Sequence, residues 1–134
     1  MKIVICGSIS FAKDMLELGN ALEKLDHEVI LPDNLEKYTR GEIKVEDKWK
    51  KKDKDLIKEH YNHIKDSDAV LIVNKNKKGI KNYFGGNSLM EMGFAHVLGK
   101  KIFLLNPAPT DLNYSDEIMA MNPIIINEDI HKIR

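Results

Sequence analysis

The sequence predicts a doubly wound α/β fold, with one five-stranded parallel sheet covered by helices on both faces. Three observations support this class. Short apolar runs alternate with stretches of helical period along the chain. Runs such as "KIVIC" and "AVLIV" are apolar at every position, which is typical of strands buried on both faces. No repeat or low-complexity linker divides the 134 residues, so we expect a single domain over 1–134.

The first half of the chain is expected to hold two strands and two helices. Residues 2–6 predict a buried strand, and residues 11–25 predict an amphipathic helix. A shorter strand at 27–32 ends at a proline. The polar segment 33–42 has weak periodicity and is expected to be a loop, whereas 45–65 has the pattern of a long amphipathic helix.

The second half continues the alternation of strands and helices. Its clearest strand, "DAVLIVN", is followed by a loop that we expect to be flexible, and a helix then leads into a further buried strand. The expected elements are strands at 68–74, 101–105 and 123–127, and helices at 88–98 and 116–121.

Five such strands suit the flavodoxin-like variant of the Rossmann architecture, with the order 2-1-3-4-5. Ligands then bind outside the carboxyl ends of the strands, at the switch point between the first and third strands. Asp33 and Asn106 come directly after predicted strands, and Asn74 is the last residue of one. We therefore expect Asp33 and Asn74 to lie near a bound ligand.

Composition limits the classes of function. The 21 basic and 21 acidic residues balance, which gives no electrostatic reason to expect nucleic-acid binding. The single cysteine, Cys6, excludes an intrachain disulfide and fits a reducing, cytoplasmic setting. No apolar stretch reaches the ~18 residues of a membrane span, and a strand beginning at Lys2 leaves no room for a signal peptide. We expect a small cytoplasmic domain.

Glu91 is the only charged residue in the apolar run 89–98, and two interpretations of it stay open. Ser88 and Glu91 match the capping box S-x-x-E, in which Ser88 caps the helix and the first-turn carboxylate gains ~0.3–1 kcal/mol from the helix dipole. Alternatively, the "GGN" that ends at Gly86 and Asn87 lets a ligand approach the backbone. Ser88 and Glu91 then share one helix face, where a carboxylate beside a serine suits a nucleophile or a general base.

The segment "CGSIS" joins the first strand to the first helix. Backbone amides, two hydroxyl groups and the positive end of a helix are suited to binding phosphate. The segment matches neither G-x-G-x-x-G nor the P-loop, so a plain strand-to-helix turn is the alternative. The candidate binding residues are Gly7, Ser8, Ile9 and Ser10.

His60 lies on the apolar side of the predicted helix 45–65, where a lone histidine is commonly a core or interface residue. His60 and His63 could together hold a metal ion, but no third ligand has a suitable spacing. We therefore expect no metal site, and nothing in the sequence implies a cofactor.

Three segments carry a resemblance to a known family: "CGSIS", "SDAVLIVN" and "GGNSLMEMGFAHVLGKKIFLL". Together they resemble the nucleoside 2-deoxyribosyltransferase superfamily, and within it the 2′-deoxynucleoside 5′-phosphate N-hydrolases. The resemblance extends from Met1 to about Met121. Its specific part is the small-residue loop followed by E-x-G-x-A and G-K, whereas the rest is general to parallel α/β proteins.

The resemblance implies roles for individual residues. Glu91 would be the nucleophile that attacks the anomeric carbon, and the segment from Gly7 to Ser10 would bind a 5′-phosphate with support from Ser88. Ser115 would reach the phosphate in the neighbouring subunit's site, so a homodimer or a dimer of dimers is implied. Asp68 matches an aspartate at the start of the third strand, where its position suggests support rather than chemistry.

Three positions depart from the N-hydrolase pattern. Ser10 stands where the family has an arginine, so one phosphate contact is weaker or comes from a lysine elsewhere. In an ungapped alignment, His60 occupies the position of the family's aspartate that is proposed to protonate the leaving base. A histidinium can do the same. Val4 replaces a tyrosine near the first strand.

These implications predict an enzyme that hydrolyses the N-glycosidic bond of a (2′-deoxy)nucleoside 5′-monophosphate through a glycosyl-enzyme on Glu91. His60 or Asp33 would protonate the leaving base. Two alternatives stay open: a deoxyribosyltransferase, in which a second base accepts the sugar instead of water, and a nucleotide-binding module without turnover. The sequence does not name the base or choose between ribose and deoxyribose.

Overall fold

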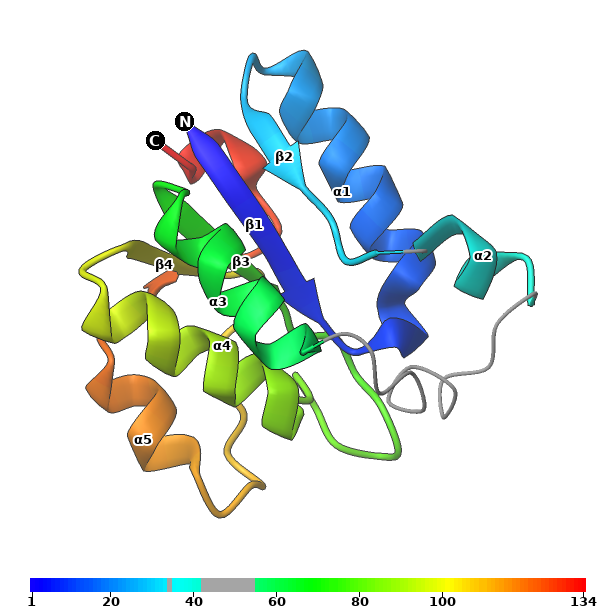
Figure 1. Ribbon diagram of the computed structural model, residues 1–134. Coiled ribbons are helices and arrows are strands. Elements are labelled where there is room, and N and C mark those ends of the chain that lie inside the picture. Colours follow the sequence, from blue (N-terminus) through cyan, green and yellow to red (C-terminus); the bar gives the residue numbers. More distant parts are fainter. Residues whose placement is uncertain (34, 42–54) are drawn as a thin grey trace.

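The computed structural model describes residues 1–33, 35–41 and 55–134 (Figure 1). Within these residues the strands form one five-stranded sheet in the order β2-β1-β3-β4-β5, and every neighbouring pair is parallel. The predicted doubly wound α/β fold and its strand order are confirmed. The strands are β1 (Lys2–Gly7), β2 (Glu28–Ile30), β3 (Ala69–Val73), β4 (Lys101–Leu104) and β5 (Ile124–Ile125).

Helices cover both faces of this sheet (Figure 1). One face carries α1 (Ala12–Lys24) with the preceding 3-10 turn η1 (Ile9–Phe11), and the C-terminal 3-10 turn η3 (Ile130–Lys132). The short helix α2 (Leu35–Thr39) lies beside α1. The other face carries α3 (Leu56–Lys65), α4 (Gly86–Val97) and α5 (Ser115–Ala120).

The alternation of side chains along β1 divides the core into two clusters. Ile3 and Ile5 pack with Met15 and Leu22 of α1, whereas Val4 packs on the opposite face against α3 and α4. All five residues of β3 are buried, because this central strand is covered on both faces. This is why the strand is apolar throughout rather than at alternate positions.

Two element predictions in the first half of the chain need correction. The segment 33–42 was expected to be a loop, but Leu35–Thr39 is helical because Leu35 is buried in the α1 cluster. The helix expected over 45–65 begins at Leu56 in the described residues, where the Asp55 side chain caps it by accepting a hydrogen bond from the Lys58 N–H (3.0 Å). Residues 45–54 lie outside the described part of the chain.

Asp68 lies just before β3, at the amino ends of the strands and opposite the candidate site. Its carboxylate accepts a 2.7 Å hydrogen bond from the backbone N–H of Lys2, and its own N–H donates to the Lys2 carbonyl. Asp68 therefore ties the amino ends of β1 and β3 together, consistent with a supporting role.

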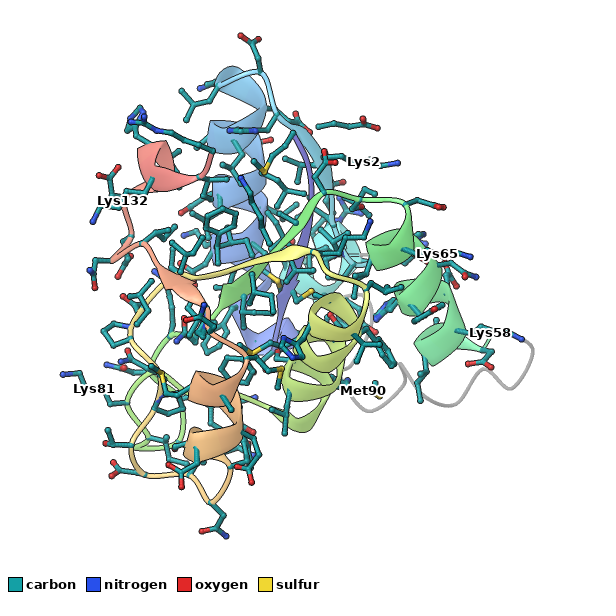
Figure 2. All side chains as sticks on the ribbon, turned by 90° about the vertical axis from the view of Figure 1, so that its left-hand side faces the viewer. Lys2, Lys58, Lys65, Lys81, Met90 and Lys132 are labelled. Carbon is teal, nitrogen blue, oxygen red and sulfur yellow. The ribbon has the colours of Figure 1, made fainter. Side chains whose placement is uncertain are left out.

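The outer face of α3 is solvated. Lys58 and Lys65 are exposed and point away from the body of the molecule (Figure 2). No helix among the described residues combines the length and the apolar character needed to cross a bilayer.

Candidate active site

The candidate site is centred on a carboxylate and an imidazole that come from two neighbouring helices. Glu91 of α4 is buried, with 7% of the residue exposed. Its Oε1 lies 3.1 Å from Nδ1 of His60 on α3, within hydrogen-bond distance. Beside this pair, Tyr61 of α3 and Phe94 of α4 make an edge-to-face ring contact with centroids 5.3 Å apart, which packs the two helices together. The sequence proposed roles for both residues but did not predict that they touch.

The predicted capping box is wrong. Helix α4 begins at Gly86 with Gly85 as its N-cap, and no side chain caps it. Gly85 adopts an extended conformation, and its carbonyl accepts from the Leu89 N–H, so the helix starts before Ser88. Ser88 is buried inside the helix at 4% exposure, and Glu91 lies beyond the first turn, where the dipole effect has decayed. The buried Glu91 carboxylate is instead held by His60.

The predicted common face of α4 is present. Ser88, Glu91 and Ala95 of α4 are all buried, as residues on one helix face would be. Ser88 therefore lies one turn before Glu91 on the same buried face.

A small crevice borders the pair. It encloses about 10 Å³, which is room for about one water molecule. Its polar lining consists of His60, His63 and Glu91, and its apolar lining comes from β1 and from the end of β2. Among the described residues, no three His, Cys, Asp or Glu side chains cluster closely enough to hold a metal ion.

The β1–α1 segment forms a polar turn at the carboxyl end of β1. The Ser8 side chain caps η1 by accepting from the Ser10 N–H (3.3 Å), and the two hydroxyl oxygens are 3.2 Å apart. Gly7 lies close against the neighbouring strand: an added Cβ would lie 3.2 Å from both Cβ and O of Val73, so a larger residue would fit only if Val73 moved by a few tenths of an ångström. Ile9 is buried and anchors the turn in the core.

A lysine that the sequence analysis did not single out joins this turn. Nζ of Lys77, in the loop between β3 and α4, donates a 2.7 Å hydrogen bond to Oγ of Ser8. The same ammonium lies 5.1 Å from the ring centroid of Tyr83, in cation–π geometry. The available sequence signal was the glycine in "NKKGI", because two-residue hairpin turns favour glycine at their second central position.

Asn74, predicted to bind substrate, is fully buried and makes its hydrogen bonds within the protein. Its Nδ2 donates to the carbonyls of Asn106 and Pro107, at 2.8 and 3.1 Å. Its Oδ1 accepts from the Asn106 N–H at 2.9 Å, and its carbonyl accepts from the Asn106 side chain at 3.2 Å. These bonds join the carboxyl ends of β3 and β4.

The remaining predicted residues lie around the same end of the sheet. Gly86 is exposed and Asn87 half-buried at the start of α4. The Ser115 hydroxyl donates to the Leu112 carbonyl (2.8 Å) at the start of α5. The neighbouring Tyr114 hydroxyl donates to the Phe84 carbonyl, just before α4, so these two segments lie side by side.

Asp33 is exposed and lines a groove of about 350 Å³ between α1, α2 and the end of β2. This volume falls within the ~300–1,000 Å³ range of small-molecule sites. Leu31 and Pro32 line both this groove and the crevice beside Glu91, so the two spaces are neighbours.

Fold and site together define a parallel α/β protein with a buried carboxylate–imidazole pair and a polar turn at the carboxyl end of β1. No protein-family model and no curated protein sequence match the chain. A matching solved structure is the Clostridium botulinum CMP N-glycosidase BcmB, with a TM-score of 0.56 and 18% sequence identity, covering 95% of this chain and 90% of that one. This match independently supports the fold.

Proposed function

We propose that the protein is an N-glycosidase that hydrolyses a (2′-deoxy)nucleoside 5′-monophosphate to free base and (deoxy)ribose 5-phosphate. The observation that carries this proposal is the contact between Glu91 and His60. A buried carboxylate held by an imidazole offers a nucleophile and a proton donor in one unit. The likeness to a CMP N-glycosidase in fold makes CMP and its deoxy counterpart the first substrates to test.

In the first step, an oxygen of Glu91 attacks the anomeric carbon while the bond from that carbon to the base breaks. The bonding electrons pass to the base nitrogen, and the imidazolium of His60 supplies the proton through Nε2, since Nδ1 faces Glu91. The proton passes to the base as the bond breaks, so the base leaves in its neutral form.

In the second step, water attacks the anomeric carbon and releases the Glu91 carboxylate. Neutral His60 takes up the proton of that water, which restores both residues. Because each of the two steps inverts the anomeric carbon, its configuration is retained overall. A nucleotide is far larger than the crevice of about 10 Å³. The proposed reaction therefore requires the side chains around Glu91 to move apart when substrate binds.

The polar turn from Gly7 to Ser10 is proposed to bind the 5′-phosphate. Its hydroxyls and backbone amides lie at the carboxyl end of β1, where parallel α/β sheets bind their ligands. Ser88 is proposed to support the phosphate, Gly86 and Asn87 to border the sugar, and Asp33 to lie toward the base. Ser115 is proposed to complete the site of a neighbouring subunit in a homodimer or a dimer of dimers.

The test is release of free base from a panel of ribo- and deoxyribonucleoside 5′-monophosphates, separated by chromatography, with Glu91→Ala measured in parallel. We expect the wild type, and not the variant, to release base from at least one of them. Saturable binding of a monophosphate with no release of its base would instead identify a nucleotide-binding module. Transfer of the sugar to an added second base would identify a transferase.

A further inference from the structure

Lys77 is a partly buried cation with no acidic partner among the described residues. Its ammonium contacts the Ser8 hydroxyl at 2.7 Å and the face of Tyr83 at 5.1 Å. Across the described part of the chain, no carboxylate lies within ion-pair distance of it. Both contacts are to neutral groups, so within the part of the chain that the structure describes the positive charge of Lys77 has no counter-charge.

Lys75, two residues earlier in the same loop, is by contrast paired with carboxylates. Its Nζ lies 3.2 Å from Asp14 and 3.7 Å from Glu128. Burial works against the charge of Lys75, but the hydrogen bonds and charges of these two carboxylates outweigh it and raise its pKa. For Lys77 the balance is reversed: burial, and then the charge of Lys78, lower its pKa.

The backbone holds Lys77 in place. The N–H and carbonyl of Lys77 both pair with those of Ile80, at 3.0 and 2.9 Å. Lys78 and Gly79 between them have φ of +53° and +74°, as in a two-residue type I′ hairpin. A further backbone hydrogen bond from Tyr83 to the Lys75 carbonyl (2.8 Å) closes the loop that carries the hairpin.

We infer that Lys77 is the residue that supplies positive charge to the phosphate site and so selects nucleotides over nucleosides. This inference rests on the proposed function, which places the 5′-phosphate at the Gly7–Ser10 turn. The turn itself carries hydroxyls and amides but no cation. Lys77 brings the charge to it from a different loop, between β3 and α4.

The chemistry of the three side chains suits a phosphate monoester. The Ser8 and Ser10 hydroxyls and the Lys77 ammonium are all hydrogen-bond donors, and a phosphate oxygen can replace Ser8 as the acceptor for Lys77. The face of Tyr83 lies on another side of the ammonium, 5.1 Å from it, and contributes a cation–π contact. A nucleoside offers no charge at this point and gains nothing from Lys77.

The experiment compares the wild type with Lys77→Met, which keeps the alkyl stem against Tyr83 but removes the charge. The matched control is Lys81→Met, because Lys81 belongs to the same loop but is exposed and points into solvent (Figure 2). Isothermal titration uses ribose 5-phosphate, 2-deoxyribose 5-phosphate and the two unphosphorylated sugars as probes. Base release from a monophosphate and from its nucleoside is measured alongside.

We expect Lys77→Met to weaken binding of the sugar phosphates by about 10- to 100-fold, the usual cost of one charge-assisted contact, while Lys81→Met matches the wild type. In the activity assay, kcat/KM for the monophosphate should fall by a similar factor and that for the nucleoside should not change. Equal sugar-phosphate affinity in Lys77→Met and the wild type would overturn the inference. So would a wild type that binds neither sugar phosphate.

The two proposals fail in different ways. If Lys77-dependent binding of sugar phosphate is found but no nucleotide releases its base, the proposed hydrolysis is refuted and the phosphate site is supported. If base is released equally from nucleosides and monophosphates, N-glycosidase activity is supported and the role of Lys77 in selecting nucleotides is refuted.

Discussion

Nδ1 of His60 and Oε1 of Glu91 lie 3.1 Å apart, although the residues are separated by 31 positions and belong to different helices. Both side chains are largely buried, with 15% of His60 and 9% of Glu91 exposed. Because a buried carboxylate needs a hydrogen-bond partner, this contact accounts for how α4 accommodates an acidic residue on its inner face. It also makes the two residues a unit whose roles substitutions can separate.

Replacement of Glu91 by glutamine is expected to reduce base release by about 10⁴-fold or more, because an amide cannot form the glycosyl ester. The amide oxygen can still accept a hydrogen bond from His60, so the fold should be retained. The measurement is single-turnover base release, with mass spectrometry of the wild type to detect the covalent intermediate. Glu117→Gln, an exposed acid on α5, is the control. Full activity in Glu91→Gln would show that Glu91 is not the nucleophile.

Replacement of His60 by asparagine separates its two roles. The asparagine amide can still donate to Glu91 but cannot transfer a proton to the base. We expect base release from a natural nucleotide to fall by about 10²–10⁴-fold, the usual contribution of a general acid. Hydrolysis of a nitrophenyl deoxyriboside 5-phosphate, whose leaving group needs no proton, should change little.

His63→Asn is the control for this substitution, because His63 lines the same crevice. An equal loss on both substrates would limit His60 to positioning Glu91. An unchanged rate on both would remove His60 from the mechanism.

Sugar-phosphate affinity is expected to depend on pH through Lys77. Burial, followed by the charge of Lys78, lowers its pKa from the usual 10.5. The cation exists below that lowered pKa, so affinity should be constant from about pH 7, where phosphate is a dianion, and should fall as pH rises through the pKa of Lys77. The fall should begin at a lower pH than for an ordinary lysine.

Lys77→Arg provides the comparison for this pH dependence, because arginine stays charged over the whole range. Titrations with ribose 5-phosphate between roughly pH 7 and 10 should therefore show a fall for the wild type and none for the variant. Identical profiles would assign the pH dependence to another group.

Replacement of Asn74 by alanine is expected to lower the free energy of unfolding by about 2–4 kcal/mol, because the buried side chain of Asn74 makes three hydrogen bonds and the partly buried Asn106 N–H would lose its acceptor. Chemical denaturation measures this change, with the exposed Asn113→Ala as the control. If Asn74 only joins β3 to β4, KM should be unchanged at a temperature where the variant is folded. A raised KM in the folded variant would support the predicted contact with substrate.

The proposed role of Ser115 in a neighbouring site can be tested by complementation. Ser115→Ala and Glu91→Gln should each have low activity alone, since each damages every site of a homodimer. Mixed under conditions that exchange subunits, they should regain up to about a quarter of wild-type activity, because half of the molecules are mixed dimers with one intact site each. No recovery, with exchange verified by mass spectrometry, would place Ser115 in its own subunit's site or in none.

The amino-acid sequence by itself determined the fold class and the strand order. Strands such as "AVLIV" are apolar at every position because they are buried on both faces, so the amino-acid composition of the segment alone indicates a buried strand. The carboxyl ends of the strands were identified for the same reason, and with them the polar turn after β1. The starts of two helices were not predicted, because the N-cap Gly85 and the buried Leu35 begin helices at positions that local patterns did not indicate.

The tertiary structure alone decided which polar groups meet. The approach of His60 to Glu91 depends on how α3 packs against α4, and the approach of Lys77 to Ser8 depends on a hairpin folding back over the end of β1. The four hydrogen bonds between Asn74 and the Asn106–Pro107 segment likewise join separate strands. Such contacts depend on the relative placement of distant segments, so a pattern of neighbouring residues does not encode them.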